Sequence, residues 1–255
     1  MENNSIEASK RANGDLISVA GINEGYTYLD IYRAIEPVIS KGGILIDMGH
    51  GKKLQFPVRL SQTIARHFPN KEMVYYDSSD PEIVRGWFAS LRSQIKRKVK
   101  KKTMDLAVKA KQVAREIPDS IRWIDSSKDY LGKASEVCFF FTRHHFDNSR
   151  DALKEAYDLL RAEGEGKSGG IAVVIDYDLK RGIEGMSRGQ AEAYVRGKFN
   201  TLNELEVIEA ESDWFEAHTK EGLAECVRDM TEIGFNVINR EVYYDKVFSC
   251  VGRKI

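Results

Sequence analysis

Hydrophobic residues along this chain follow two alternating spacings. Short runs of consecutive apolar residues predict buried strands, and segments with apolar residues three or four apart predict amphipathic helices. The runs predict strands at 44–48, 73–76, 121–124, 137–141 and 171–175, and two further strands at 235–242 and 246–251 finish the chain. The wider spacing predicts helices at 28–39, 58–68, 81–117, 152–160 and 221–233, with a polar helical stretch at 178–216. The chain therefore alternates between strand and helix over most of its length.

This alternation decides the predicted fold class. Consecutive parallel strands need a crossover connection, usually a helix, and such crossovers are right-handed. We therefore predict an α/β fold, with a parallel sheet and helices on both faces. The last two strands are joined by a tight Tyr-Tyr-Asp connection, which predicts an antiparallel hairpin at the end of the chain.

Composition is that of an ordinary globular protein. The 255 residues fit one large domain, 42% of them are hydrophobic, and 39 Lys and Arg balance 39 Asp and Glu. These values exclude collagen-like and disordered chains, and a surface built wholly for nucleic acid.

The apolar runs are too short to cross a bilayer, so no membrane association is predicted. Cys138, Cys226 and Cys250 are widely spaced and predict no disulfide framework, so a reducing cytoplasm is the expected location.

Candidate ligand residues lie just after the predicted strands. In a sheet of this class, the ligand crevice lies outside the carboxyl ends of the strands. After the first strand, Gly49 and Gly51 allow a sharp turn, and the next helix start offers free N–H groups to an anion. After the second strand, Asp77 offers a carboxylate that can accept both hydroxyls of a ribose. A tight turn and an exposed strand-end acid, with no ligand, are the alternative interpretation.

Several stretches resemble the class I S-adenosylmethionine-dependent methyltransferases of the small-molecule type. The sequence ILIDMGHG at 44–51 looks like the family's first motif, and VYYD at 74–77 looks like its ribose-binding strand end. FFTRHHF at 140–146, ALKEAYDLL at 152–160 and GGIAVV at 169–174 are similar to the fourth strand, the following helix and the glycine turn into the fifth strand. The last helix and the terminal hairpin also look like those of the family.

The resemblance runs over 28–254 and implies a Rossmann-like, doubly wound, mostly parallel seven-stranded sheet with an antiparallel C-terminal hairpin strand and helices on both faces. It implies S-adenosylmethionine as cofactor and in-line displacement of its methyl group by a small organic acceptor. The cofactor-binding residues that it implies are Asp47, Gly49, His50, Gly51, Lys53, Asp77, Ser78, Asp125, Ser126, Ser127 and Thr142.

Two positions depart from the family's pattern. Lys53 stands where a third glycine is common, and 125–127 reads Asp-Ser-Ser where an acid often meets the adenine amine. We expect Lys52 or Lys53 to pair with the methionyl carboxylate of the cofactor near the helix start. NAD binding also uses a glycine loop and a strand-end acid, but its fingerprint fails at Leu54, where the last glycine is required.

Methyl transfer from an activated donor needs little side-chain chemistry beyond holding the reactants together. A base is required only where the acceptor carries a proton of high pKa. The base candidates are His144 and His145 after the fourth strand and His218 ahead of the penultimate helix, with Tyr177 and Asp176 as weaker ones. Each histidine has packing or helix capping as its alternative role.

The resemblance is consistent with a single methyltransferase-like domain over 1–255. Within it we expect a leader and cap helix at 1–41, a long helical insertion at 81–117 and a cap segment at 181–220. Aromatic residues in the cap segment and near the N-terminus predict a partly apolar small-molecule pocket. Their alternative role is to hold the cap on the core.

A dense basic run at 92–102 supports a second hypothesis. It could bind RNA or a protein partner, and the chain would then be a methyltransferase-like module without turnover. A solvated helix face is the preferred interpretation, because no aromatic residue interrupts the run as a stacking platform for bases would. The five histidines include no H-x-x-x-H pair, so no metal centre is predicted. The sequence leaves the oligomeric state open.

Overall fold

A computed structural model of the chain describes the sheet and most of the C-terminal half of the chain. The residues described are 36–48, 64, 67–76, 121–124, 126–140, 142–164, 168–198, 214–243 and 247–255.

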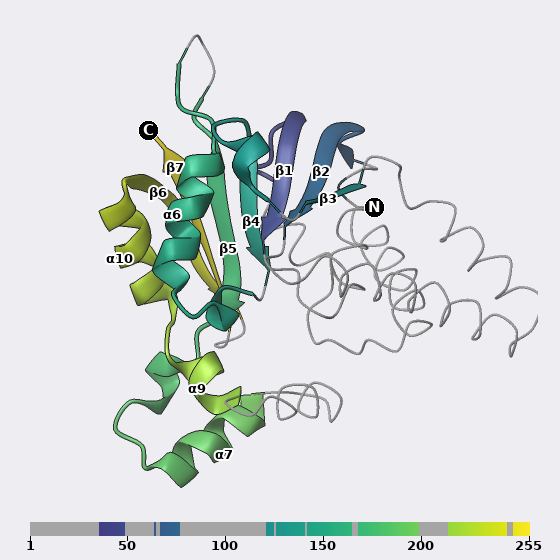
Figure 1. Ribbon diagram of the computed structural model, residues 1–255. Helices are drawn as coiled ribbons and strands as arrows, with labels where there is room; N and C mark the ends of the chain where they lie inside the picture. The colour runs from purple at the N-terminus through teal and green to yellow at the C-terminus, as the bar shows by residue number, and fades with distance from the viewer. Residues whose placement is uncertain are drawn as a thin grey trace, which may run out of the picture.

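Strands in the described part of the chain form one sheet in the order β3-β2-β1-β4-β5-β7-β6. The first five pair in parallel, β7 is antiparallel to β5, and β6 is antiparallel to β7. Their bounds are β1 Gly42–Met48, β2 Asn70–Tyr76, β3 Ile121–Ile124, β4 Glu136–Phe140, β5 Ile171–Tyr177, β6 Phe235–Tyr243 and β7 Val247–Lys254. The predicted α/β sheet with an antiparallel C-terminal hairpin is confirmed (Figure 1).

Among the described residues, α6 follows β4, α7 follows β5, and α9 and α10 precede β6. Their bounds are α6 Ser149–Leu159, α7 Arg188–Lys198, α9 Trp214–Thr219 and α10 Leu223–Ile233, with short 3-10 turns η1 Lys128–Tyr130, η2 Arg143–His145 and η3 Lys180–Ile183. Asn148 begins α6, because its side chain accepts hydrogen bonds from the N–H groups of Arg150 and Asp151. Gly234 ends α10 in a left-handed conformation with φ of 113°.

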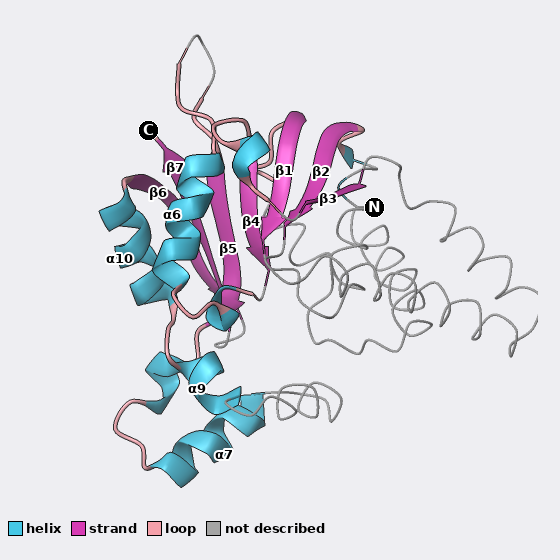
Figure 2. Ribbon diagram, in the orientation of Figure 1, coloured by secondary structure: helices cyan, strands magenta, loops and turns pink. Residues whose placement is uncertain are grey.

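One face of the sheet packs against α6 and α10 (Figure 2). Alternate residues of the strands, such as Val137, Phe139 and Val174, meet Leu153 of α6 and Met230 of α10 in this core. The helices bury these residues because their apolar positions recur three and four apart.

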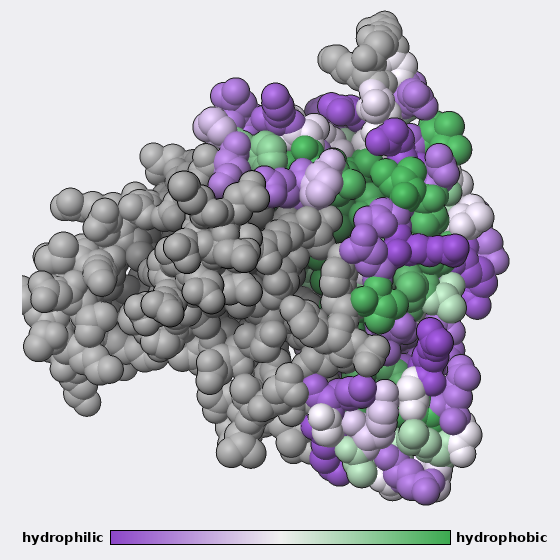
Figure 3. Space-filling view, turned by 180° about the vertical axis from the view of Figure 1, so that it is seen from behind, coloured by the Kyte–Doolittle hydropathy of each residue, from purple (hydrophilic) through white to green (hydrophobic). Residues whose placement is uncertain are grey.

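The opposite face of the sheet carries a second apolar core. It includes Leu45, Cys138, Val173 and Val251, together with Ile64. Seen from behind, hydrophobic residues gather in the middle of the described part and hydrophilic residues border them (Figure 3). Strands that are apolar on both faces are typical of sheets covered on both sides. The predicted helices at 28–39, 58–68 and 81–117 lie mostly outside the described residues, so helices on both faces stay a prediction.

The amino ends of three neighbouring strands are joined by a buried ion pair. Lys71 of β2 contacts Glu136 of β4, and its ammonium also donates to the carbonyl of Gly42 in β1, 2.9 Å away. Burial lowers the pKa of Lys71, and the charge of Glu136 counteracts part of this shift. Gly43 has φ of 92°, and a Cβ there would come within 2.6 Å of the Ser135 hydroxyl, so this backbone conformation and this close approach both favour glycine.

The sequence patterns located these strands within a few residues but misplaced some helix ends. The prediction of helix up to 39 is wrong over 36–38, which form a turn, because Pro37 lacks the N–H that a helix needs. Helix α6 begins three residues before the predicted 152, at its Asn148 cap. The polar stretch from 178 is not one helix but η3 and α7 separated by a turn, where Gly185 has φ of 75°. The single-domain boundaries, the 1–41 leader and the 81–117 insertion stay predictions, since nearly all of both segments lies outside the described residues.

None of the helices in the described ranges combines the length and the apolar character needed to cross a membrane.

Candidate functional site

The carboxyl ends of β1, β2, β4 and β5 meet at one edge of the sheet. The strand order reverses between β1 and β4, and open α/β sheets bind ligands at such a point. Met48 at the end of β1 is the Cα partner of Tyr76 at the end of β2. The two strand ends that lead into Gly49 and Asp77 therefore lie side by side.

Most of the expected cofactor residues themselves lie outside the described part of the chain. These are Gly49, His50, Gly51, Lys53, Asp77, Ser78 and Asp125. Their roles stay predictions, as does the expected pairing of Lys52 or Lys53 with the methionyl carboxylate.

Asp47 is buried at the end of β1, next to the strand-order reversal. Its neighbours across the sheet are Tyr75 of β2 and Cys138 of β4. Burial, and then the negative charge of Asp47, raise the pKa of the Tyr75 hydroxyl and of the Cys138 thiol well above their usual values. Both groups keep their protons at neutral pH, so Cys138 is not a thiolate nucleophile.

Three more of the expected cofactor residues are described. Thr142 is buried after β4, and its hydroxyl donates to the Met48 carbonyl at 2.8 Å, which joins the ends of β4 and β1. Ser127 donates to Glu155 of α6 at 2.6 Å, so its hydroxyl is engaged with that helix. Ser126 is exposed beside it. Contact of these three residues with a cofactor stays a prediction.

Two of the three base candidates come together at this edge. The rings of His144, from η2, and His218, from α9, have centroids 4.4 Å apart. Tyr177, at the end of β5, lies within 5.5 Å of the first ring and 5.2 Å of the second. Both histidines are buried. For His145, the structure describes the backbone within η2 and not the side chain.

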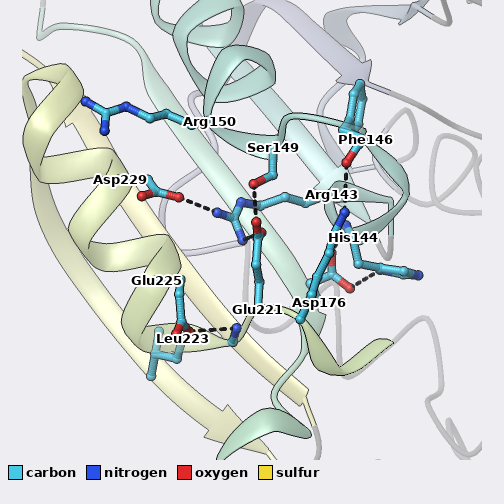
Figure 4. A network of polar contacts seen from close by, with 12 residues as sticks. Arg143, His144, Phe146, Ser149, Arg150, Asp176, Glu221, Leu223, Glu225 and Asp229 are labelled. Carbon is cyan, nitrogen blue, oxygen red and sulfur yellow. Dashed lines mark hydrogen bonds and ion pairs between the residues drawn. The ribbon is translucent and has the colours of Figure 1, made fainter. Parts of the chain in front are cut away.

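Asp176 at the end of β5 holds His144 in place (Figure 4). Its carboxylate contacts Nδ1 of His144 at 2.5 Å, and it also accepts from the backbone N–H groups of His144 and Tyr177. Burial by itself would raise the pKa of Asp176, but the charge of His144 and these hydrogen bonds lower it below the usual value. Asp176 is therefore ionised at neutral pH.

This contact assigns the ring nitrogens of His144. An ionised carboxylate can only accept, so Nδ1 of His144 carries a proton. The other nitrogen, Nε2, is then the one that can take up a proton. His218 follows the same logic, because its Nδ1 lies 2.7 Å from the carbonyl of Trp214. The cluster thus combines one oriented imidazole with its carboxylate and a second imidazole against it.

Sequence reasoning missed the polar residues that surround His144. Arg143, directly before it, is buried and forms ion pairs with Glu221 and with Asp229 of α10. A signal was present, because Asp229 lies on the buried side of α10 with Cys226 and Met230. A carboxylate at such a position requires a buried partner.

The aromatic residues of the expected cap segment mainly pack on one another. Phe215 of α9 is buried with Leu179, Ala191 and Val195, and the guanidinium of Arg188 lies 4.0 Å from its ring centroid. Trp214 and Tyr194 pack against this small core, whereas Met186 is exposed. Their described contacts therefore lie mainly within this segment. Both of the expected roles, lining an acceptor pocket and holding the cap on the core, stay predictions.

Within the described ranges, no three His, Cys, Asp or Glu side chains lie close enough together to hold a metal ion.

Comparison with known proteins finds similarity in structure alone. No family model and no curated protein sequence matches the chain. A SAM-dependent methyltransferase from Aquifex aeolicus superposes with a TM-score of 0.52 at 11% identity, over 89% of each chain. PigF with S-adenosylhomocysteine gives 0.51 at 12% identity, over 88% of this chain and 61% of PigF. The chain has the fold of a class I S-adenosylmethionine-dependent methyltransferase.

Another structure with this fold is the phosphoethanolamine N-methyltransferase 2 of Haemonchus contortus in complex with S-adenosyl-L-methionine. Its TM-score is 0.52 at 13% identity, over 89% of this chain and 52% of that chain. At such identities the likeness concerns the fold, and function has to be argued from the residues of the site.

Proposed function

We propose that this protein is an S-adenosylmethionine-dependent methyltransferase that acts on a small organic acceptor by in-line displacement. The observation that carries the proposal is the His144–Asp176 pair, buried against His218 at the ligand-binding edge of a methyltransferase fold. A buried imidazole with an oriented carboxylate is an arrangement that suits proton transfer.

The side-by-side ends of β1 and β2 support a cofactor site at this edge of the sheet. Met48 and Tyr76 pair there, and Asp47 is buried beside them. Asp47, Gly49, Gly51 and Asp77 would hold the cofactor, with the two glycines near its amino-acid part and Asp77 at its ribose. When bound, S-adenosylmethionine supplies a methyl group already activated by a positively charged sulfur.

His144 would accept the proton of the acceptor at Nε2. Asp176 keeps Nδ1 protonated and stabilises the imidazolium that forms, because its negative charge lies 2.5 Å away in a buried site. The pair therefore favours an acceptor that must lose a proton, such as a hydroxyl group. An acceptor with a free lone pair would need no such base.

Several features support a small acceptor and a cytoplasmic location. Two of the structures with this fold are a phosphoethanolamine N-methyltransferase with its cofactor and the same enzyme with phosphomonomethylethanolamine, which is a small molecule. The three cysteines of the chain are free thiols, as the cytoplasm would keep them.

Calorimetry with S-adenosylhomocysteine tests the cofactor assignment. We expect micromolar binding to the full chain, lost in Asp77→Ala and retained in the control Asp129→Ala, which changes an exposed acid in η1. Transfer of a labelled methyl group to a panel of small hydroxyl compounds and amines then identifies the acceptor class.

Absence of cofactor binding would support the second hypothesis, a methyltransferase-like module without turnover. If S-adenosylhomocysteine does not bind, while RNA binds with an affinity that falls steeply with salt, the chain is a binding module that acts through 92–102. That basic run lies outside the described residues, and no contact of the described residues favours it.

A further inference from the structure

Arg143 is a charged side chain in the interior, one residue before His144. It belongs to the 3-10 turn η2, and its side chain is 2% exposed. Burying a guanidinium is costly unless carboxylates pair with it. The buried guanidinium therefore needs carboxylate partners, and these partners connect Arg143 to α6 and α10.

Two carboxylates bracket the Arg143 guanidinium (Figure 4). One terminal nitrogen lies 2.7 Å from Glu221, in the segment between α9 and α10, and the other donates to Asp229 of α10 at 2.8 Å. The second oxygen of Glu221 accepts from the Ser149 hydroxyl at the start of α6, at 2.7 Å. Arg143 thus joins η2, α6 and α10 at a single point.

A series of contacts also holds the segment that carries His218 against residues 143–149. The His218 ring meets that of His144, Lys220 donates to the Phe146 carbonyl at 2.9 Å, and Glu221 meets Arg143. Residues 218–221 therefore follow 143–149 closely. The ion pair between Arg143 and Glu221 lies at the end of this contact, directly before His144 and three residues after His218 in the chain.

We propose that Arg143 and Glu221 are positioning residues for His144, an inference that rests on the proposed role of His144 as a base. A three-residue 3-10 turn has weak hydrogen bonds of its own, and no side chain caps η2. The planar guanidinium held by two carboxylates fixes the turn in one orientation. That orientation directs the His144 ring toward Asp176 and places it against His218.

The imidazole signals of His144 test this directly, without need of an acceptor. In protein labelled with ¹⁵N-histidine, the Nδ1 proton shared with Asp176 gives a signal assigned by its loss in His144→Gln. We expect that signal to weaken or disappear in Glu221→Gln and in Arg143→Lys, since a lysine cannot bridge both carboxylates. The matched control is Glu232→Gln, which breaks the exposed pair between Arg150 and Glu232 and should leave the signal unchanged.

Glu221→Gln and Arg143→Lys are both measured, so that one result remains if the other variant folds poorly. Thermal unfolding shows which of the two variants is folded. An unchanged His144 signal in the folded variant overturns the proposal, and so does an equal loss in Glu232→Gln. Calorimetry of the wild-type chain with S-adenosylhomocysteine separates this positioning proposal from the proposed function. Failure to bind removes the proposed function, whereas the His144 signal alone decides whether Arg143 and Glu221 position this ring.

Discussion

At the scale of single residues, the chemistry of this protein depends on which partner each buried polar group finds. His144 and His218 are close in space although 74 positions separate them in the sequence. Asp176 gives one of them a fixed orientation, while the other contacts the backbone of its own helix. We therefore expect His144, and not His218, to be sensitive to loss of a carboxylate.

Replacing Asp176 with asparagine tests this expectation. The amide can donate to Nδ1 of His144 and so favours the wrong tautomer, which would place the proton on Nε2. We expect the rate of methyl transfer to a hydroxyl acceptor to fall by about 10²–10⁴-fold. Calorimetry should show unchanged affinity for S-adenosylhomocysteine. The control is Asp147→Asn at an exposed position, and a wild-type rate in Asp176→Asn would exclude His144 as the base.

The lowered pKa of Asp176 also predicts a dependence of stability on pH. A carboxyl with a lower pKa in the folded state stabilises that state at every pH above its unfolded value, about 3.9. This contribution is lost as the pH falls below about 4 and toward the folded pKa. Urea unfolding of wild type and Asp176→Asn should show a difference at about pH 5 that shrinks as the pH falls below about 4. A difference that grows as the pH falls below about 4 would contradict the assignment.

At the scale of elements, the two ends of the sheet have different roles. The carboxyl ends of the strands carry the histidine cluster, while the amino ends of β2, β1 and β4 are joined by Lys71 and Glu136. Glu136 also accepts from the Ser40 N–H and from the Ser135 hydroxyl, so its carboxylate stays in place if the lysine is removed. The amino end thus stabilises the fold without contacting the site.

Substitution of Lys71 with methionine should therefore lower stability and leave cofactor binding intact. Removing one partner of a buried pair leaves an uncompensated charge and costs about 3–5 kcal/mol of unfolding free energy. The double variant Lys71→Met/Glu136→Gln should recover part of this loss. Lys133→Met, at an exposed site, should change the free energy by about 0.5 kcal/mol or less. Equal effects of the two lysine variants in urea unfolding would contradict the buried role of Lys71.

At the scale of the whole molecule, the sheet brings together the ends of β1 and β2, which lead into Gly49 and Asp77. A cofactor that binds there would stabilise only the folded chain, because the unfolded chain does not bring these strand ends together. Cofactor binding should thus be visible in the stability of the entire domain.

Thermal unfolding measures this coupling. At a concentration of S-adenosylhomocysteine about 100 times its Kd, the stabilisation is about 2.7 kcal/mol. For a chain of this length that raises Tm by roughly 5–10 °C. The shift should vanish in Asp77→Ala and persist in Asp129→Ala. A shift of equal size in all three proteins would place the ligand elsewhere.

Local patterns in the sequence were sufficient for the framework of this fold. The strand patterns located the described strands within about three residues. For the central strands this is because a strand buried on both faces must be apolar along its length. Local chemistry also explains where helix prediction failed. Pro37 and Gly185 interrupt helical spacing through their own backbone restrictions, which hydrophobic periodicity does not register.

By itself, the sequence determined the α/β class, the C-terminal hairpin and the shortlist of histidines, since each depends on neighbours along the chain. Only the tertiary structure decided that His144 meets Asp176 and His218, and that Arg143 is buried between Glu221 and Asp229. These contacts join residues 32 to 86 positions apart. Their existence depends on how strands and helices pack, because burial removes water as an alternative partner and makes each polar group take one from a distant segment.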